Sequence, residues 1–396
     1  MSLPRKPHLH IRANRQPHGM SEAAGQTGSA FRWLRSGEAA LAAMLAAIGE
    51  ARQSVRLETY MFKAGGIGDR FLQALLAASR RGVKVQVLAD AFGSLGQSDS
   101  YWQPLRDAGG EFRWFNAPAW RGCRDHRKVL VVDGAAAFIC GCNIAPEYFG
   151  DGVARGWRDL GMKSTSTVLA GELAEGFDAM FQRAEARPKR LHSLRRARYD
   201  TQRSEETWQL LLSGPGWGHR RLKQRVAADI ARAHDIRIIS AYFLPTWRLH
   251  REIVRAARRG RPVRLILAGQ SDVKTAQLAT RWLYPRLLRA GVEIYEYQPQ
   301  VLHAKLLVLG EVVYAGSANL DTRSLNINYE LLLRLEEPAL AAEARSLFEH
   351  DLRRSRRIVA ADWHAARSLL NRLLQAAAFL FLTKVDPYLT RRWLKQ

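Results

Sequence analysis

The chain carries one pattern of short segments twice, and this internal duplication limits what it can fold into. The matching segments are 51–62 with 231–245 (ARQSVRLETYMF, ARAHDIRIISAYFLP), 80–90 with 258–269 (RRGVKVQVLAD, RRGRPVRLILAG) and 126–133 with 303–310 (HRKVLVVD, HAKLLVLG). The offset of 177 residues (303 − 126) is too long for a solenoid repeat. The sequence therefore predicts two copies of one domain.

Each copy alternates helical and strand patterns of apolar residues. The expected elements are helices over 38–52 and 69–81 with strands over 54–62 and 83–90, then helices over 222–234 and 249–259 with strands over 236–243 and 263–268. Such alternation is typical of an α/β domain, in which helices cover a central sheet. We therefore expect two α/β domains.

The charge of the chain points to a polyanionic partner. Its 396 residues include 61 Lys and Arg but 37 Asp and Glu, for a net charge of +24. Nucleic acid, an acidic membrane surface or a phosphorylated substrate would each fit this surplus. An apolar content of 47% excludes global disorder. Cys123, Cys140 and Cys142 are too few for a disulfide framework, which favours a reducing compartment.

Composition divides the chain into five parts: two domains, and three basic segments that flank or join them. The expected parts are a disordered basic segment over 1–30, a first domain over 31–186, a basic linker or exposed arm over 187–207, a second domain over 208–352 and a basic amphipathic tail over 353–396. The first twenty residues lack the apolar core of a signal peptide. The tail's longest apolar run, 376–382, is too short to cross a bilayer. A helix there could lie in a membrane interface or pack on the second domain, and the sequence favours neither.

Chemistry is concentrated in a repeated His-x-Lys motif. His126 and Lys128 precede a run of β-branched and aliphatic residues, and His303 and Lys305 repeat the spacing. On a strand, residues two apart face the same side, so each histidine should lie beside its lysine. An ammonium neutralises phosphate oxygens while an imidazole attacks phosphorus or moves a proton.

Each motif is followed by a turn of small residues with an asparagine, Asn143 in the first copy and Asn319 in the second. Two half-sites related by a pseudo-twofold axis would meet at the domain interface. Together they would supply a nucleophile, a general acid and four donors to a phosphate.

These stretches resemble the phospholipase D superfamily, the phosphodiesterases with two HKD motifs, and most of all its bacterial cardiolipin synthase branch. The resemblance rests on HRKVLVVDGAAAFICGCNIAPEY, on WRD at 157–159 and on HAKLLVLGEVVYAGSANLDTRSLNINYE, and it extends over residues 35 to 352. It implies two pseudo-symmetric domains, each a central mixed sheet flanked by helices, with the active site at their interface.

The resemblance also implies roles for single residues. His126 would attack phosphorus to form a phosphohistidine, and His303 would serve as general acid and base. Asp159 and Glu330 would each orient the histidine of its own motif. The phosphate-binding residues would be Lys128, Lys305, Asn143, Asn319 and Ser317.

The acidic end of the HKD motif differs between the copies. Asp133 belongs to the catalytic motif of the first copy, but its odd offset from His126 points it away from the His/Lys side. We therefore expect Asp133 to have a structural role at a turn. Gly310 stands at the equivalent position of the second copy, and we predict that it does not abolish catalysis. The pattern implies no metal or other cofactor, because Cys140 and Cys142 have no second pair at zinc spacing.

The motif specifies the reaction and leaves the phosphodiester open. The first hypothesis is a phosphatidyltransferase that makes cardiolipin from two phosphatidylglycerols. The alternatives are a phospholipase D that uses water or another alcohol, a nuclease of the same superfamily, and an inactive protein that binds anionic lipid. A nuclease is less favoured because no nucleic-acid-binding module is recognisable. We expect a monomer in the cytoplasm that binds peripherally to the inner face of the cell membrane, with phosphatidylglycerol and cardiolipin as its lipid partners.

Overall fold

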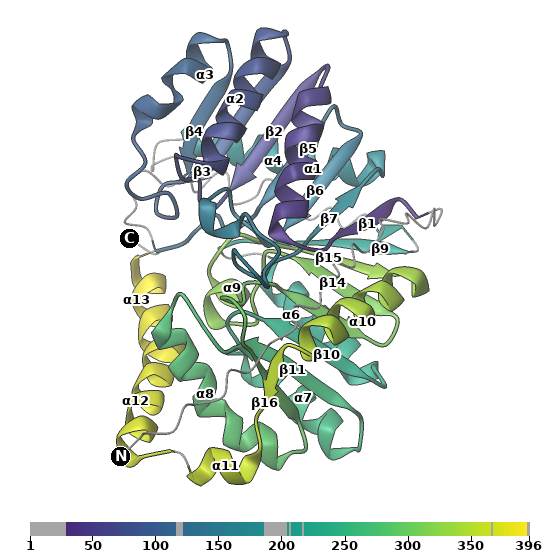
Figure 1. Cartoon of the computed structure of the whole chain (residues 1–396), viewed down its shortest axis with the longest axis vertical. Helices are drawn as coiled ribbons and strands as arrows, with labels where there is room; N and C mark the ends of the chain where they lie inside the picture. The colour runs from purple at the N-terminus through teal and green to yellow at the C-terminus, as the bar shows by residue number, and fades with distance from the viewer. Residues whose placement is uncertain are drawn as a thin grey trace, which may run out of the picture.

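The computed structural model describes residues 29–115, 122–185, 204–205, 207–215, 218–365 and 367–393. Over these residues the chain forms two α/β halves, drawn from purple to blue and from green to yellow in Figure 1. Each half is built on one mixed sheet with helices packed against it. The predicted fold class is therefore confirmed.

The first half contains a seven-stranded sheet in the order β1-β7-β6-β5-β2-β3-β4. Its strands are β1 (Phe31–Leu34), β2 (Ser54–Thr59), β3 (Lys84–Asp90), β4 (Glu111–Phe115), β5 (Val129–Val132), β6 (Ala136–Cys140) and β7 (Gly161–Ser164). Its helices are α1 (Gly37–Glu50), α2 (Ile67–Arg80), α3 (Gln103–Asp107) and α4 (Thr167–Glu185), with short 3-10 turns at Asp99–Trp102 and Pro146–Tyr148.

The second half contains a nine-stranded sheet in the order β16-β12-β11-β10-β13-β14-β15-β9-β8. Its strands are β8 (Ser204–Glu205), β9 (Trp208–Ser213), β10 (Ile236–Ser240), β11 (Val263–Ala268), β12 (Glu293–Tyr297), β13 (Leu306–Leu309), β14 (Val312–Gly316), β15 (Glu330–Glu336) and β16 (Ser355–Arg357). Its helices are α6 (His219–Arg232), α7 (Trp247–Arg258), α8 (Lys274–Arg289), α9 (Thr322–Asn326) and α10 (Pro338–Leu352).

The two sheets share one topology, which confirms the duplication. In each, three parallel strands (β2-β3-β4 and β10-β11-β12) are followed by an antiparallel series. The order β4-β3-β2-β5-β6-β7-β1 corresponds strand for strand to β12-β11-β10-β13-β14-β15-β9. Strands β8 and β16 extend the second sheet, and β16 comes from the segment expected to form the tail.

The central strands are hydrophobic because both faces of each sheet are covered. All four residues of β5 and all four of β13 are buried. One apolar core joins the two halves and includes Val131, Ile139, Val308 and Val313, together with residues of α4 and α10. The outer helices bury one stripe each, as α2 does with Phe71 and its apolar neighbours. The interface between the halves is therefore packed like a domain interior.

Some predicted boundaries shift. The strand expected over 54–62 ends at Thr59, and residues 60–66 connect it to α2.

The tail folds into α11 (Ala360–Ala365), α12 (Leu369–Leu380), a π-helical turn η5 (Phe381–Val385) and α13 (Asp386–Trp393), with α12 lying along α8 (Figure 1). No helix among the described residues has the length and apolar character needed to cross a membrane. The predicted disordered segment over 1–30, except its last two residues, and most of the 187–207 linker lie outside the described residues.

Candidate active site

The two His-Lys motifs lie in extended segments that enter β5 and β13, not inside these strands as the pattern suggested. Each segment is hydrogen-bonded to the opposite half of the molecule. The His126 amide donates to the Tyr329 carbonyl at 3.0 Å, and the His303 amide donates to the Arg158 carbonyl at 2.8 Å. Isolated bridges pair Asp125 with Tyr329 and Arg158 with Leu302. The interface thus fixes the backbone of both motifs.

The carboxylates that orient the histidines are exchanged between the halves, which corrects the expected pairing. His126 Nδ1 lies 3.1 Å from the carboxylate of Glu330, and His303 Nδ1 lies 2.6 Å from Asp159 Oδ2. Each acid immediately follows the residue that pairs with the opposite motif, so the interface places it beside the histidine of the other half. The spacing of these residues along the sequence does not predict which carboxylate pairs with which histidine.

Both carboxylates are fully buried, which excludes the surface ion pairs that their neighbours Arg158 and Arg334 could have formed with them. Arg158 instead pairs with Asp351 at 2.9 Å, and Arg334 pairs with Asp229 at 2.7 Å. A carboxylate on Nδ1 fixes the imidazole tautomer and leaves Nε2 as the reactive nitrogen.

The lysines lie beside their histidines, as predicted. Lys128 Nζ donates to the His126 carbonyl at 2.7 Å, and Lys305 Nζ donates to the His303 carbonyl at 2.5 Å. The charge of Lys305 also acts on His126 and on Lys128, across the interface. The structure therefore brings the two half-sites into one electrostatic environment.

The small residues after each motif support the carboxylates. Ser317, expected to bind phosphate, donates its hydroxyl to Glu330 Oε2 at 2.5 Å. At Gly141 an added Cβ would lie 2.2 Å from Asp159 Oδ1, so only glycine leaves room for this carboxylate. Ser317 therefore positions an acid in this structure, and Gly141 has the corresponding place in the first half.

The asparagines differ in their partners. Asn143 accepts from the Met61 amide at 3.2 Å and donates to the Tyr148 hydroxyl at 2.8 Å. The buried amide oxygen of Asn319 has no hydrogen-bond partner among the described residues. Asn319 is thus the more available of the two for a phosphate.

Tyr148 is a site residue that the sequence did not reveal. Its hydroxyl lies 3.4 Å from His303 Nε2, and its ring packs edge-on against the His303 ring at 5.0 Å. The corresponding position of the second copy, five residues after Asn319, is Ser324. Since the duplication was the guide to the site, a residue present in one copy alone gave no signal.

Asp133 does not belong to the catalytic cluster, as its odd offset indicated, so its grouping with the catalytic residues is corrected. Its carboxylate accepts from the backbone amides of residues 52–54 at 2.8–2.9 Å and caps the start of β2. Its φ of 54° places it in the left-handed region at a hairpin turn. Gly310 takes the same place in the second half with a φ of 64°. Neither residue reaches the histidines.

Burial sets the ionisation of the site. It lowers the pKa of His126 to about 4 and the pKa of Lys128 to about 7, and it also lowers the pKa values of His303 and Lys305. Burial alone would raise the pKa of Asp159, but Lys305 and His303 hold it below its usual value. The site therefore combines neutral imidazoles with ionised carboxylates.

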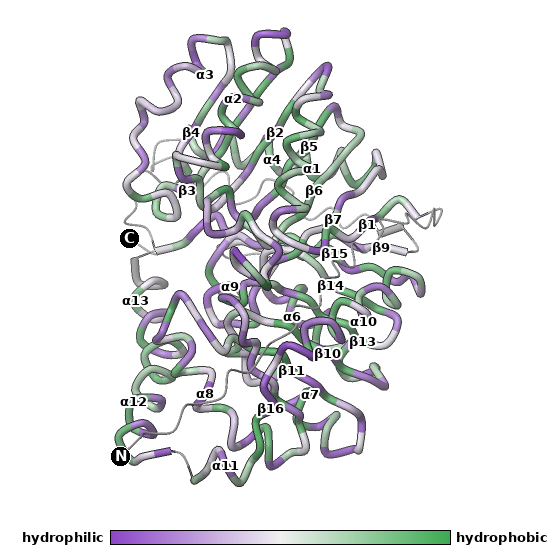
Figure 2. Tube along the Cα trace, in the orientation of Figure 1, coloured by the Kyte–Doolittle hydropathy of each residue, from purple (hydrophilic) through white to green (hydrophobic). Residues whose placement is uncertain are grey.

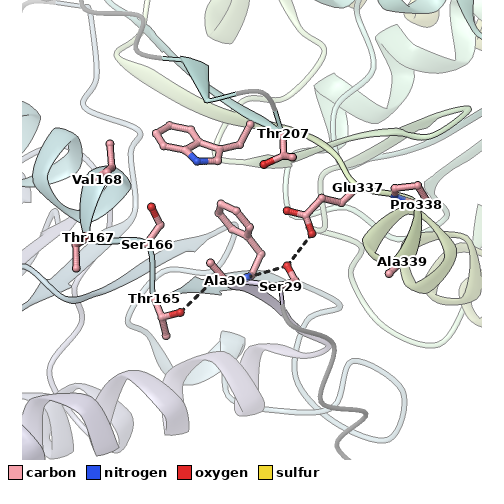
Figure 3. A pocket seen from close by; sticks show the side chains of 12 residues that line it. Ser29, Ala30, Thr165, Ser166, Thr167, Val168, Thr207, Glu337, Pro338 and Ala339 are labelled. Carbon is pink, nitrogen blue, oxygen red and sulfur yellow. Dashed lines mark hydrogen bonds between the residues drawn. The ribbon is translucent and has the colours of Figure 1, made fainter.

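The structure also contains an open depression of about 710 Å³ (Figure 3). Ser29, Thr165 and Glu337 are among the side chains around it, and the Ser29 hydroxyl donates to Glu337 at 2.7 Å. Neither the histidines nor the lysines of the two motifs line this depression. No cluster of potential metal ligands occurs among the described residues.

Two copies of one α/β domain, each contributing a His-Lys motif to their common interface, are characteristic of the phospholipase D class of phosphodiester-transferring enzymes. The sequence profile of the family described as "Cardiolipin synthase, PLD-like domain" matches residues 44–181 and 226–352. The chain belongs to this family.

Relatives and solved structures agree with this assignment. The chain is 31% identical to cardiolipin synthase B of Salmonella typhi over 322 residues, 78% of this chain and 77% of the relative. It is 31% identical to cardiolipin synthase A of Pseudomonas aeruginosa over 349 residues, 85% of this chain and 70% of the relative. The crystal structure of phosphatidylserine synthase from Haemophilus influenzae has the same fold, with a TM-score of 0.71, 14% identity and coverage of 91% and 95% of the two chains.

Proposed function

We propose that the protein is a phosphatidyltransferase that makes cardiolipin and glycerol from two molecules of phosphatidylglycerol. The observation that carries the proposal is the pair of histidines, each fixed by a buried carboxylate from the opposite half. The relatives named cardiolipin synthase support the choice of substrate.

In the first half-reaction, His126 Nε2 attacks the phosphorus of one phosphatidylglycerol. A P–N bond forms, the P–O bond to the glycerol headgroup breaks, and His303 Nε2 gives its proton to the departing oxygen. Lys128, Lys305 and Asn319 hold the phosphoryl oxygens as charge develops on them. The lowered pKa of His126 keeps its imidazole neutral and nucleophilic.

In the second half-reaction, His303 Nε2 takes the proton from a headgroup hydroxyl of another phosphatidylglycerol. That oxygen attacks phosphorus, the P–N bond breaks, and cardiolipin leaves with His126 neutral again. His303 must start each cycle protonated, although burial lowers its pKa. The negative charge of a bound phosphodiester raises that pKa again and so favours the acid form when substrate is present.

One chain supplies both half-sites, so we propose a monomer as the active unit. The substrate lies in a membrane, and we place the protein peripherally at its inner face. Cys140 and Cys142 are buried free thiols, in keeping with a reducing compartment.

The reaction is tested with purified protein, phosphatidylglycerol vesicles and EDTA, with cardiolipin, glycerol and phosphatidic acid as readouts. We expect cardiolipin and glycerol in equal amounts. Phosphatidic acid in place of cardiolipin would identify a hydrolase. Cleavage of plasmid or single-stranded DNA with untouched lipid would identify a nuclease. No turnover of either would leave an inactive lipid-binding protein.

The roles of the histidines are tested by trapping the intermediate on substrate labelled in its phosphate. With a labelled phosphatidyl ester of p-nitrophenol, whose leaving group needs no proton, His303→Ala should still form an acid-labile, base-stable phosphoenzyme and should accumulate it, because the second half-reaction lacks its base. His126→Ala should neither turn over nor take up label. Label on His126→Ala would assign the nucleophile to the other histidine.

A further inference from the structure

The C-terminal helix has an inverted distribution of polarity. Over α12, η5 and α13 the side chains that face outward are largely apolar, with 73% of Leu369, 64% of Leu370 and 60% of Leu373 exposed. Gln375 and Thr390, which are polar, are buried on the inner side. The exposed apolar side chains, here called the tail stripe, are Leu369, Leu370, Leu373, Leu374, Leu380, Phe381, Val385, Tyr388 and Leu389.

The tail stripe keeps one direction along the helix. Its residues 369, 373, 381, 385 and 389 lie at multiples of four along the chain, a spacing that drifts by about 40° per four residues around an α-helix. The π-helical turn η5, in which the Asp386 amide bonds to the Phe381 carbonyl, has more residues per turn and reduces this drift. Figure 2 shows the largely green trace of α12 on the outer side of α8. A helix of a water-facing surface would have the opposite arrangement.

The charge of the tail indicates which kind of partner the tail stripe can bind. Residues 367–393 contain five Lys and Arg but only one acidic residue, Asp386. Arg372 and Lys384 are exposed beside the apolar side chains. Two copies of this surface would bring like charges together, whereas an anionic bilayer takes up the apolar side chains and attracts the basic ones.

The tail is fastened to the loops that carry the active site. Arg323, in α9 and four residues after Asn319, donates to Asp386 at 2.7 Å and to the carbonyl of Gly122. Gly122 lies four residues before His126, and an added Cβ there would meet Thr390 at 2.7 Å. Next along the chain, the Arg124 guanidinium stacks over the ring of Phe92, which is 40% exposed. These contacts hold the tail helix against α9, which follows the second motif, and against the segment that leads to the first motif.

We propose that the tail stripe is a docking surface for an anionic lipid bilayer, and that the Arg323–Asp386 bridge holds the active site at the bilayer surface. The second part rests on the proposed function, because it presumes a substrate drawn from the membrane. The first part concerns binding alone and stands on the exposed side chains and their charge.

Docking is tested by co-sedimentation of the full chain with vesicles of phosphatidylglycerol and phosphatidylcholine. Leu373→Glu should reduce the partition coefficient at least tenfold, while the matched control Val168→Glu, which alters an exposed valine on α4, should not. Circular dichroism confirms folding of both variants. Wild-type binding should fall with added salt and be weak on pure phosphatidylcholine. Equal binding of Leu373→Glu and wild type would overturn the docking surface, and so would a wild-type dimer that Leu373→Glu dissociates without change in vesicle binding.

Turnover separates docking from catalysis. On short-chain phosphatidylglycerol below its micellar concentration, Leu373→Glu should match wild type, whereas on vesicles its rate should fall about tenfold. A wild type that binds vesicles but turns over neither substrate would refute the proposed function and leave docking intact.

The bridge is tested by Asp386→Asn. This variant should bind vesicles as wild type does and turn over the short-chain lipid normally, but lose several-fold in rate on vesicles. An unchanged rate on vesicles would refute the role of the bridge.

Discussion

The two histidines are alike in their backbone anchoring and their carboxylate partners but differ at the reactive nitrogen. His303 Nε2 lies near the Tyr148 hydroxyl, whereas His126 Nε2 makes no hydrogen bond within the described part of the chain. An unengaged, neutral imidazole suits a nucleophile. A nitrogen that already exchanges a hydrogen bond with a hydroxyl suits the acid and base that must serve an alcohol.

Tyr148→Phe tests the importance of this hydroxyl. The change removes the hydrogen-bond partner of the Asn143 amide nitrogen and one of two partners of His303 Nε2, which also lies 3.3 Å from Lys305 Nζ. We expect kcat/KM for short-chain phosphatidylglycerol to fall about tenfold, because the variant loses both the contact with His303 at 3.4 Å and the hydrogen bond with Asn143 at 2.8 Å. Tyr295→Phe, which removes a hydroxyl bonded to Glu293 in β12, is the matched control. Equal kinetics of the two variants would show that Tyr148 only packs against the ring.

The pH dependence of kcat/KM tests the charge of Lys128. Its pKa is lowered to about 7 by burial, so the free enzyme loses this positive charge as pH rises through that value. His126, with a pKa of about 4, becomes protonated only at strongly acidic pH. We expect kcat/KM to decline towards pH 4, and to decline on the alkaline side as Lys128 loses its charge near pH 7 and as His303, whose pKa burial also lowers, loses the proton that it needs as general acid.

Lys128→Arg tests whether Lys128 causes the decline of kcat/KM at high pH, here called the alkaline limb. A guanidinium stays charged throughout, so the limb should move to higher pH even if the overall rate falls. An alkaline limb at the same pH in this variant would assign it to another group.

At the scale of elements, equivalent turns of the two halves have different tasks. The hairpin after β5 uses Asp133 to cap β2, whereas the hairpin after β13 has Gly310, near His234. Both hairpin turns follow their strands, β5 and β13, whereas the histidines precede these strands. The turn after β6 is different, because Gly141 is in contact with Asp159.

Two glycine variants distinguish these turns. Gly310→Asp should leave turnover within twofold of wild type, because aspartate tolerates a positive φ and the residue does not reach the site. Gly141→Ala should lower kcat by about a hundredfold, because its methyl group would displace Asp159 from His303. Melting temperatures of both variants report any loss of fold. An inactive wild type that Gly310→Asp restores would show that the acid at this position is required.

Much of the fold followed from the sequence, because local patterns specify local elements. Strands β5 and β13 are apolar runs, and the duplication already implied paired half-sites. The exchange of Glu330 and Asp159 between halves could not be foreseen, since it depends on backbone pairing of Tyr329 and Arg158 across the interface. The inverted polarity of the tail was equally hidden, because one apolar pattern serves burial and exposure alike.

At the scale of the whole molecule, the candidate active site is complete only when the two halves are packed together. The core that joins them contains strands from both sheets together with α4 and α10. A buried ion pair crosses the same interface, where Arg158 of the first half meets Asp351 of α10. The carbonyl of Arg158 also accepts the amides of His303 and Ala304, both at 2.8 Å. The stability of the interface and the geometry of the second motif therefore both depend on Arg158.

Asp351→Asn tests this dependence. Removing one charge from a buried pair leaves Arg158 uncompensated, and we expect the free energy of unfolding to fall by about 3–5 kcal/mol. The control is Glu38→Gln, which breaks the exposed pair with Arg155 and should cost about 0–1 kcal/mol. Urea denaturation measures both, and unfolding should remain one transition because a single core spans the halves. Two separate transitions in the wild type would show that the halves fold independently and that the interface adds little to their stability.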